Sequence, residues 1–170
     1  AEGAAIQAAM LSKNSKQSIS KIQMTDVIPL SIGIEGLVNR MFFLIKRNTS
    51  TPAFGTSTFT TTAHNQSDAL ISIYEGERPN VKNNRILGEM TLTGLTPAPP
   101  GRCNITISLK VDENGILTVS GQEQRQHGEN SRELKITYVR GIRSEAEVKN
   151  TLNDAEESKE EDERFVRFAE

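Results

Sequence analysis

Few residues of this chain could do covalent chemistry, because its 170 residues include one cysteine, Cys103, and two histidines, His64 and His127. A cysteine nucleophile needs a base within hydrogen-bond reach and a third group that orients the base. Cys103 follows a turn rich in proline and glycine, whereas His127 lies in the polar segment 121–130, so their spacing does not favour a catalytic pair. Three such side chains also cannot form a zinc site of cysteine and histidine alone. The sequence therefore predicts neither a thiol enzyme nor a structural metal.

The two carboxylates that flank Gly76 are the second candidate for chemistry. Glu75 and Glu77 could act as general acid and base, as paired carboxylates do in glycoside hydrolysis. Acidic residues beside a hairpin glycine are more often solvated turn residues, and we expect these two to be solvated. The clustered glycines, at 33–36 and 94–101, do not form the strand-to-helix cradle that holds a phosphate. We therefore expect no catalysis and no cofactor in this chain.

The composition narrows the classes of partner. The chain is 35% hydrophobic and 25% charged, and its formal net charge is -2. That balance gives no global field to attract nucleic acid or an anionic membrane. The longest purely apolar run, 41–45, is far shorter than the ~20 residues that cross a bilayer. We expect a soluble, cytoplasmic protein that binds neither nucleic acid nor membrane.

Alternating apolar residues from position 26 onward predict about eight short β-strands. Successive side chains of a strand point to opposite faces, so apolar residues two positions apart line one face. The segments with this pattern are Ile32/Ile34, Met41/Phe43/Ile45, Ala69/Ile71/Ile73, Met90/Leu92, Ile105/Ile107/Leu109/Val111, Leu117/Val119 and Leu134/Ile136/Tyr138, with a weaker alternation around Phe59 in 57–63. Glycine, proline and asparagine turns separate them, and no helical pattern intervenes. The predicted fold class is mainly β, an antiparallel two-sheet β-sandwich.

Both flanks of the predicted sandwich have a different pattern. Segment 1–11 is rich in alanine and favours helix, and segment 12–21 is a polar linker. After the strands, residues 144–147 form a capping box that predicts the start of a helix. Its apolar stripe consists of Val148, Leu152 and Ala155. Segment 156–164 is almost wholly charged and has little apolar surface to bury, so we expect a C-terminal α-helical segment with weak apolar packing.

Two apolar residues stand where a plain sandwich does not need them. Leu37 follows the apparent end of a strand, and Phe59 lies among threonine and serine. Both could belong to an ordinary core. Alternatively, the loops at one end of the sandwich bring them together as an open groove for an extended apolar segment. The pattern alone leaves both interpretations open.

Five strings of sequence carry a more specific signal, because they occur in a fixed order over nearly the whole chain. They are DVIPLSIGIE (26–35), IKRNTSTP (45–52), DALISIYEGER (68–78), LTPAP (95–99) and VDENGILTVS (111–120). In order and spacing these strings closely resemble the substrate-binding domain of Hsp70 chaperones, and residues 1–11 resemble the last residues of that family's ATPase domain. The resemblance implies three parts: an ATPase-domain remnant and interdomain linker at 1–25, a peptide-binding β-sandwich at 26–140, and the start of a truncated helical lid at 141–170.

The resemblance also implies the function and the site. The expected function is chaperone-type binding of short extended apolar segments of unfolded polypeptides, without catalysis in this chain. The residues at the family's pocket positions are Ile34, Gly36, Leu37, Phe59, Thr60, Thr62, Ala69, Ile71 and Ile105. Leu37 and Thr62 fall where the family arches two side chains over the peptide backbone. The expected partners are unfolded hydrophobic peptides and, in a longer chain, an ATPase domain or co-chaperones.

Several positions depart from the family's pattern. Segment 38–40 replaces the usual pair of glycines and stiffens that turn, segment 22–25 makes the linker more polar, and His64 replaces a loop aspartate. These departures favour an alternative, a degenerate Hsp70 fragment that acts as a self-associating or structural interaction protein. In that alternative, the groove is filled by the chain's own linker or by a neighbouring chain, so self-association would use the linker or the lid.

Overall fold

The computed structural model describes residues 26–124, 130–137 and 144–168. Among these residues, eight strands are followed by two α-helices. The strands are β1 (Ile32–Glu35), β2 (Met41–Ile45), β3 (Ala53–Thr60), β4 (Asp68–Glu75), β5 (Arg85–Thr93), β6 (Asn104–Val111), β7 (Ile116–Glu123) and β8 (Asn130–Thr137). The helices are α2 (Glu145–Glu157) and α3 (Lys159–Phe168), and two 3-10 turns, η1 (Leu37–Asn39) and η2 (Val81–Asn83), lie between strands.

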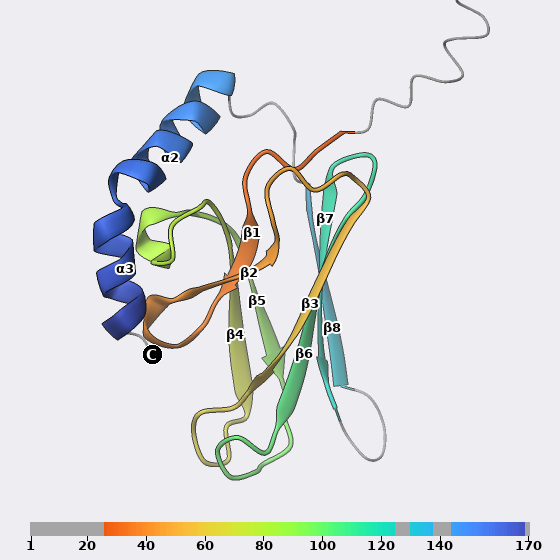
Figure 1. Cartoon of the computed structure of the whole chain (residues 1–170). Coiled ribbons are helices and arrows are strands. Elements are labelled where there is room, and N and C mark those ends of the chain that lie inside the picture. Colours follow the sequence, from red (N-terminus) through yellow and green to blue (C-terminus); the bar gives the residue numbers. More distant parts are fainter. Residues whose placement is uncertain (1–25, 125–129, 138–143, 169–170) are drawn as a thin grey trace, which may run out of the picture.

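The strands form two four-stranded sheets, with the orders β2-β1-β4-β5 and β3-β6-β7-β8. Every neighbouring pair within each sheet is antiparallel. Figure 1 shows the two sheets as crossing layers, with α2 and α3 on the side away from β7 and β8. The predicted fold class, a mainly β, two-sheet sandwich with a C-terminal helical segment, is confirmed.

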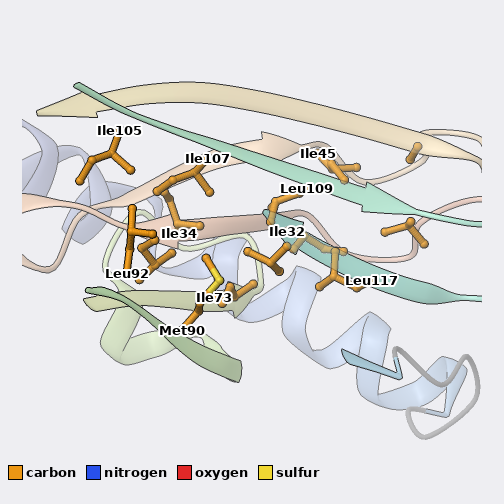
Figure 2. Close-up of a cluster of buried hydrophobic side chains, with 14 of the residues drawn as sticks. Ile32, Ile34, Ile45, Ile73, Met90, Leu92, Ile105, Ile107, Leu109 and Leu117 are labelled. Carbon is orange, nitrogen blue, oxygen red and sulfur yellow. The ribbon is translucent and has the colours of Figure 1, made fainter. Parts of the chain in front are cut away.

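The core lies between the two sheets. Ile32, Ile73 and Leu92 from one sheet face Ile107 and Leu117 from the other, and none of these side chains is more than 3% exposed (Figure 2). Burial of one such side chain contributes about 1.5–3 kcal/mol. The alternation seen in the sequence is therefore the pattern of residues that fill this interface.

One predicted alternation is wrong, because β2 contains a bulge. Phe43 pairs with Gly33 and Ile45 pairs with Ile32, so one extra residue of β2 lies between the two pairs. The extra residue reverses the faces of the strand. Ile45 enters the core, whereas Phe43 lies on the outer face and is 38% exposed.

The weak alternation around Phe59 placed its strand too late in the sequence. The strand β3 runs over Ala53–Thr60 rather than 57–63. Its first half contains Gly55, where a side chain would collide with the main-chain carbonyl of Leu44. Because the backbone of β2 passes this close, glycine interrupts the apolar period that would have marked the start of the strand.

The helix predicted at Ser144 is confirmed, and its capping box is present. The Ser144 hydroxyl accepts a hydrogen bond from the Glu147 amide at 3.3 Å, and the Ser144 amide donates to the Glu147 carboxylate at 2.8 Å. The predicted segment 1–25 and the boundary at 140/141 lie outside the described residues, so the three-part division stays a prediction. No helix of the described residues is long and apolar enough to span a membrane.

Candidate functional site

A groove of about 350 Å³ lies where the ends of β1 and β3 meet the beginnings of β4 and β6. All nine residues predicted for the site line this groove: Ile34, Gly36, Leu37, Phe59, Thr60, Thr62, Ala69, Ile71 and Ile105. Six further residues line it that the sequence did not single out: Glu35, Thr61, Gln66, Leu70, Ser72 and Ile107. The structure thus brings the predicted residues together, whereas peptide binding in the groove stays a prediction.

The floor of the groove is apolar because three strands turn core residues toward it. Ile34, Ile71 and Ile105 belong to β1, β4 and β6 and are 1%, 4% and 4% exposed. Two leucines at the mouth are open to solvent instead: Leu37 is 67% exposed and Leu70 is 63% exposed. An apolar floor with exposed apolar residues at its mouth is typical of a surface that binds another apolar group.

Along part of the groove, one edge of β4 pairs with no strand of the described residues. The strand β4 pairs with β5 over 68–75 but with β1 only over 73–75. Along 69–72 the chain of β1 has already turned away to form the loop over the groove, so β4 has no β1 partner there. An extended segment could lie along this part of β4 and use main-chain hydrogen bonds.

The loop 36–40, which we call the arch, is closed at its neck by main-chain hydrogen bonds. The Gly36 amide donates to the Arg40 carbonyl at 2.8 Å, and the Arg40 amide donates to the Leu37 carbonyl at 3.2 Å. Inside the arch, Val38 and Asn39 adopt left-handed conformations with φ of 58° and 57°. This region is costly for a β-branched residue, so Val38 stores strain at the position where the sequence lacks a glycine. The closed arch fixes the exposed Leu37 at the mouth of the groove.

An aromatic pair supports the arch. The rings of Phe42 and Phe59 meet edge to face, with centroids 5.4 Å apart and planes at 83°. The guanidinium carbon of Arg40 lies 5.8 Å from the centre of the Phe42 ring. A side chain at Gly36 would collide with the same ring, so glycine is required there for steric reasons. The sequence analysis missed Phe42, because this residue lies within a predicted strand and not in a loop.

Thr61 is one of the polar groove residues that sequence reasoning missed. Its side chain is buried, with 5% of the residue exposed, and its hydroxyl has no hydrogen-bond partner among the described residues. Its main chain is paired, since its amide donates to the Cys103 carbonyl at 3.2 Å and its carbonyl accepts from Gly101 at 2.8 Å. A period of two from Phe59 could have identified Thr61 as an inward residue. A buried hydroxyl without a partner costs about 1–3 kcal/mol, and a bound polar group would relieve that cost.

A second, charged contact attaches the helices to the sandwich. Arg78, whose side chain is 5% exposed, donates from Nε to both carboxylate oxygens of Asp162 at 2.9 and 2.8 Å. Its Nη1 and Nη2 donate to Asp154 at 3.1 Å and to Glu161 at 3.2 Å. We call these four residues the Arg78 cluster. The charged segment expected to pack weakly therefore binds the sandwich through carboxylates.

Burial and ion pairing compete within the Arg78 cluster. Burial raises the pKa of the Asp162 carboxyl above its usual range, although the hydrogen bond and charge of Arg78 act in the opposite direction. Burial acts to lower the pKa of Arg78, but its hydrogen bonds and charge interactions with Asp162 and Asp154 raise the pKa overall. Asp162 is the inner carboxylate, with 14% of its side chain exposed, against 63% for Asp154. Desolvation therefore weakens the benefit of the ionised Asp162 carboxylate.

Tyr74 and Glu35 form a polar contact beside the groove. The Tyr74 hydroxyl donates to the Glu35 carboxylate at 3.3 Å. Burial, and then the nearby charge of Glu35, raise the pKa of Tyr74 above its usual value. The phenol therefore stays protonated and acts as a donor that orients Glu35 in the wall of the groove.

The expectation that Glu75 and Glu77 are solvated is wrong. Glu75 is 4% exposed, and Glu77 accepts hydrogen bonds from the Ser31 amide at 2.7 Å and from the Ser31 hydroxyl at 3.2 Å. The turn folds back on the residue that precedes β1, and the Glu77 carboxylate anchors it there. The local sequence could not reveal this contact, because Ser31 and Glu77 are 46 positions apart.

The remaining candidates for chemistry are not gathered at the groove. Cys103 is buried, and its thiol donates to the Glu123 carboxylate at 3.5 Å, whereas His64 lies exposed in the loop after β3. His127 lies outside the described residues. Within the described ranges, no three histidine, cysteine, aspartate or glutamate residues are grouped as a metal would need.

Comparison with known proteins agrees with the architecture. A family model described as "Hsp70 protein" matches residues 1–170. The chain is 44% identical over 164 residues to a heat shock 70 kDa protein of Neurospora crassa, a match that covers 96% of this chain and 25% of that protein. It is 42% identical to heat shock cognate 70 kDa protein 3 of Dictyostelium discoideum, covering 96% of this chain and 26% of that protein. The chain thus spans about a quarter of the length of these relatives.

Proposed function

Because this chain belongs to the Hsp70 family, we propose that its groove binds short, extended, apolar segments of unfolded polypeptides. Because the chain spans 25% of the length of the Neurospora relative, its chaperone role and its substrates are proposed here and are not carried over from that protein. In this role the chain captures a segment and releases it unchanged.

The groove itself supports this proposal most directly. Residues from β1, β3, β4 and β6 line one space of about 350 Å³, with an apolar floor and apolar residues at its mouth. A space of this kind fits apolar side chains of many shapes, because the hydrophobic effect is not directional. Broad selectivity follows from such a surface.

Main-chain groups along the groove favour a ligand in an extended conformation. Over 69–72, the edge of β4 that pairs with no described strand offers main-chain groups along the groove. The side-chain hydroxyl of Thr61 offers a further hydrogen-bonding group. An extended peptide has the same polar groups at every residue, whatever its sequence. Binding through these groups therefore needs no particular side chain beyond an apolar one at the centre.

A titration of the whole chain with fluorescent heptapeptides tests the proposal. We expect a Leu-centred peptide to bind with a dissociation constant of micromolar to tens of micromolar, about -7 to -8 kcal/mol. The matched control is the same peptide with its central leucine replaced by aspartate, which the apolar floor should reject. Equal anisotropy changes for both peptides, or none for either, would contradict the proposal.

The alternative, a fragment whose groove is filled by its own linker or by a second copy, predicts a different result. Removal of residues 1–25 should then create peptide binding that the whole chain lacks. Gel filtration with light scattering of both forms reports whether the linker also causes association. Under the peptide-binding proposal, the two forms bind the heptapeptide with similar affinity.

The proposal assigns no catalysis to this chain. Calorimetry with ATP and Mg²⁺ should give no heat of binding, and measurable nucleotide binding would contradict this part of the proposal. An ATPase domain and co-chaperones are proposed partners only for a longer chain. The cytoplasmic location expected from the sequence stays a prediction, which fractionation of cells that express the tagged natural protein would test.

A further inference from the structure

Leu70 is an exposed apolar residue of β4 that lies among polar residues. Its side chain is 63% exposed, and the residue lines the groove. On its face of the sheet, Thr91 lies directly across on β5, and Ser72 is two positions along β4. Ala69 and Ile71, which point to the opposite face, belong to the core and its border. Leu70 therefore brings apolar surface to the groove without contributing to the core.

The pairing of β4 with β1 indicates where an extended segment can lie beside Leu70. The last residues that pair are Ile34 and Ile73. Continued by three residues, the same register would place Leu37 opposite Leu70, but β1 ends at Glu35 and the arch begins. Over 69–72 this edge of β4 pairs with no strand of the described residues. A segment in the groove can take the place beside β4 that β1 leaves.

The same register determines which way the side chains of such a segment point. Residues directly opposite each other on neighbouring strands share one face of the sheet, with Cβ atoms about 4.5–5.5 Å apart. A residue opposite Ala69 or Ile71 therefore points toward the floor of the groove. Its neighbour, opposite Leu70, points to the outer face and lies beside the leucine. An apolar side chain at that second position would cover Leu70, whereas a polar one would leave it in contact with water.

We propose that Leu70 is a specificity-determining residue of the groove, which favours segments whose residue next to the inward-pointing one is also apolar. The inference rests on the proposed function, because it names the class of segment that the same groove binds. An apolar pair across two neighbouring strands changes affinity by a factor of about two to five relative to a pair without this contact.

The test compares two fluorescent heptapeptides that have a central leucine and either valine or threonine on both sides of it. Valine and threonine have similar shapes and both favour extended backbone, so the two peptides differ mainly in polarity. Both neighbours are changed together, because either can lie opposite Leu70, depending on the direction and register of the bound segment. Anisotropy titrations of the whole chain should give about two- to fivefold tighter binding of the valine peptide.

Two variants at position 70 repeat the same comparison on the protein. Leu70→Val keeps an apolar side chain and should keep the preference, whereas in Leu70→Thr the ratio of the two affinities should fall to about one. Phe54→Thr is the control, because Phe54 of β3 is 66% exposed and is not among the residues that line the groove. It should keep the ratio. The ratio within one variant is independent of its folded fraction, so a merely structural role of Leu70 would not change it.

The outcomes separate the inference from the function on which it rests. Equal affinity of the wild-type chain for both peptides overturns the inference and leaves the proposed function standing. A preference that persists in Leu70→Thr, or disappears in Leu70→Val or in Phe54→Thr, overturns the role of Leu70. Failure of the wild-type chain to bind either peptide overturns the proposed function, and the inference with it.

Discussion

The groove, which we propose binds a peptide, and the Arg78 cluster, which holds the helices on the sandwich, have opposite chemical character. The groove presents an apolar floor, in which Ile34 is 1% exposed and Ile105 is 4% exposed. The Arg78 cluster presents one buried cation to three carboxylates of the helices. Apolar contact tolerates many partners, because it depends on area rather than direction. Charge-assisted hydrogen bonds are directional, so the Arg78 cluster suits one fixed partner within the same chain.

This difference predicts that salt and substitutions will change peptide affinity at the groove independently of the attachment of the helices at the Arg78 cluster. Salt screens the exposed carboxylates of Asp154 and Glu161, whereas it strengthens or leaves unchanged an apolar contact. Groove variants should change peptide affinity with little effect on the helices. Variants of the Arg78 cluster should do the reverse.

The largest effect is expected for Arg78→Ala. This change leaves the partly buried Asp162 without its cation, and loss of one partner of a buried pair costs about 3–5 kcal/mol. Amide hydrogen exchange across 159–168 should become about a hundredfold faster or more as α3 separates from the sandwich.

Arg47→Ala is the control for this experiment, because Arg47 makes a more exposed ion pair with Glu77 at 4.0 Å. Such a surface pair contributes at most about 1 kcal/mol, so exchange in α3 should stay unchanged. Equal protection of α3 in the wild-type chain and in Arg78→Ala would show that the Arg78 cluster does not hold the helices.

The next effect is expected in the groove, for Ala69→Phe. A ring at this position takes up space in the groove that Ala69 lines, and loss of a pocket for one Leu-sized side chain is worth about 1.5–3 kcal/mol. The affinity for a Leu-centred heptapeptide should fall roughly tenfold or more. Ala146→Phe, on the exposed face of α2, is the control and should bind like the wild type. Unchanged titration curves for Ala69→Phe at unchanged thermal stability would remove Ala69 from the site.

Thr61→Val should have a smaller effect: it should raise the stability of the folded chain and lower its affinity for peptide. Valine has the shape of threonine without its unpaired buried hydroxyl, so the free energy of unfolding should rise by about 1 kcal/mol. If the hydroxyl binds the peptide main chain, the same change should weaken peptide binding about fivefold. Thr61→Ser keeps the hydroxyl and should keep the affinity. A purely structural threonine would give the same affinity in all three proteins.

The smallest effect is expected from acidification of the Arg78 cluster. The pKa of Asp162 is raised on folding, because burial outweighs its attraction to Arg78. The folded chain therefore binds this proton more tightly than the unfolded chain, and the stability from this group falls, rather than rises, as pH increases through the interval between the two pKa values. Between pH 7 and pH 5, exchange protection of α3 should change by less than about twofold after correction for intrinsic exchange.

The substitution Asp162→Asn tests directly whether the ionised Asp162 carboxylate holds α3 on the sandwich. The substitution removes a charge whose desolvation opposes folding, so it should loosen α3 less than Arg78→Ala does. Asp154→Asn, at a carboxylate whose side chain is 63% exposed, is the control. A tenfold loss of protection on acidification, or an Asp162→Asn variant as loose as Arg78→Ala, would show that the ionised carboxylate is the dominant attachment.

The amino-acid sequence by itself determined the elements of this protein. Period-two alternation identified most strands that fill the core, although it assigned Phe43 of β2 to the wrong face and placed β3 too late. The capping box at 144–147 located the start of α2. Both signals are local, because the direction of a side chain follows from the geometry of a few neighbouring residues. The nine groove positions came from the resemblance to a family, since periodicity alone left Leu37 and Phe59 as either core or groove residues.

The tertiary structure alone decided which distant residues meet. Arg78 and its carboxylate partners are 76 to 84 positions apart, and no local pattern connects a turn of the sandwich with a helix beyond it. The bulge in β2 moved Ile45 into the core and left Phe43 outside, because a single extra residue reverses the faces of a strand. In the same way, the ring of Phe42 lies where a side chain at Gly36 would be, and the Thr61 hydroxyl has no hydrogen-bond partner within the part of the chain that the structure describes. Such contacts depend on how two strands or a strand and a helix are placed in space, which the period of neither segment contains.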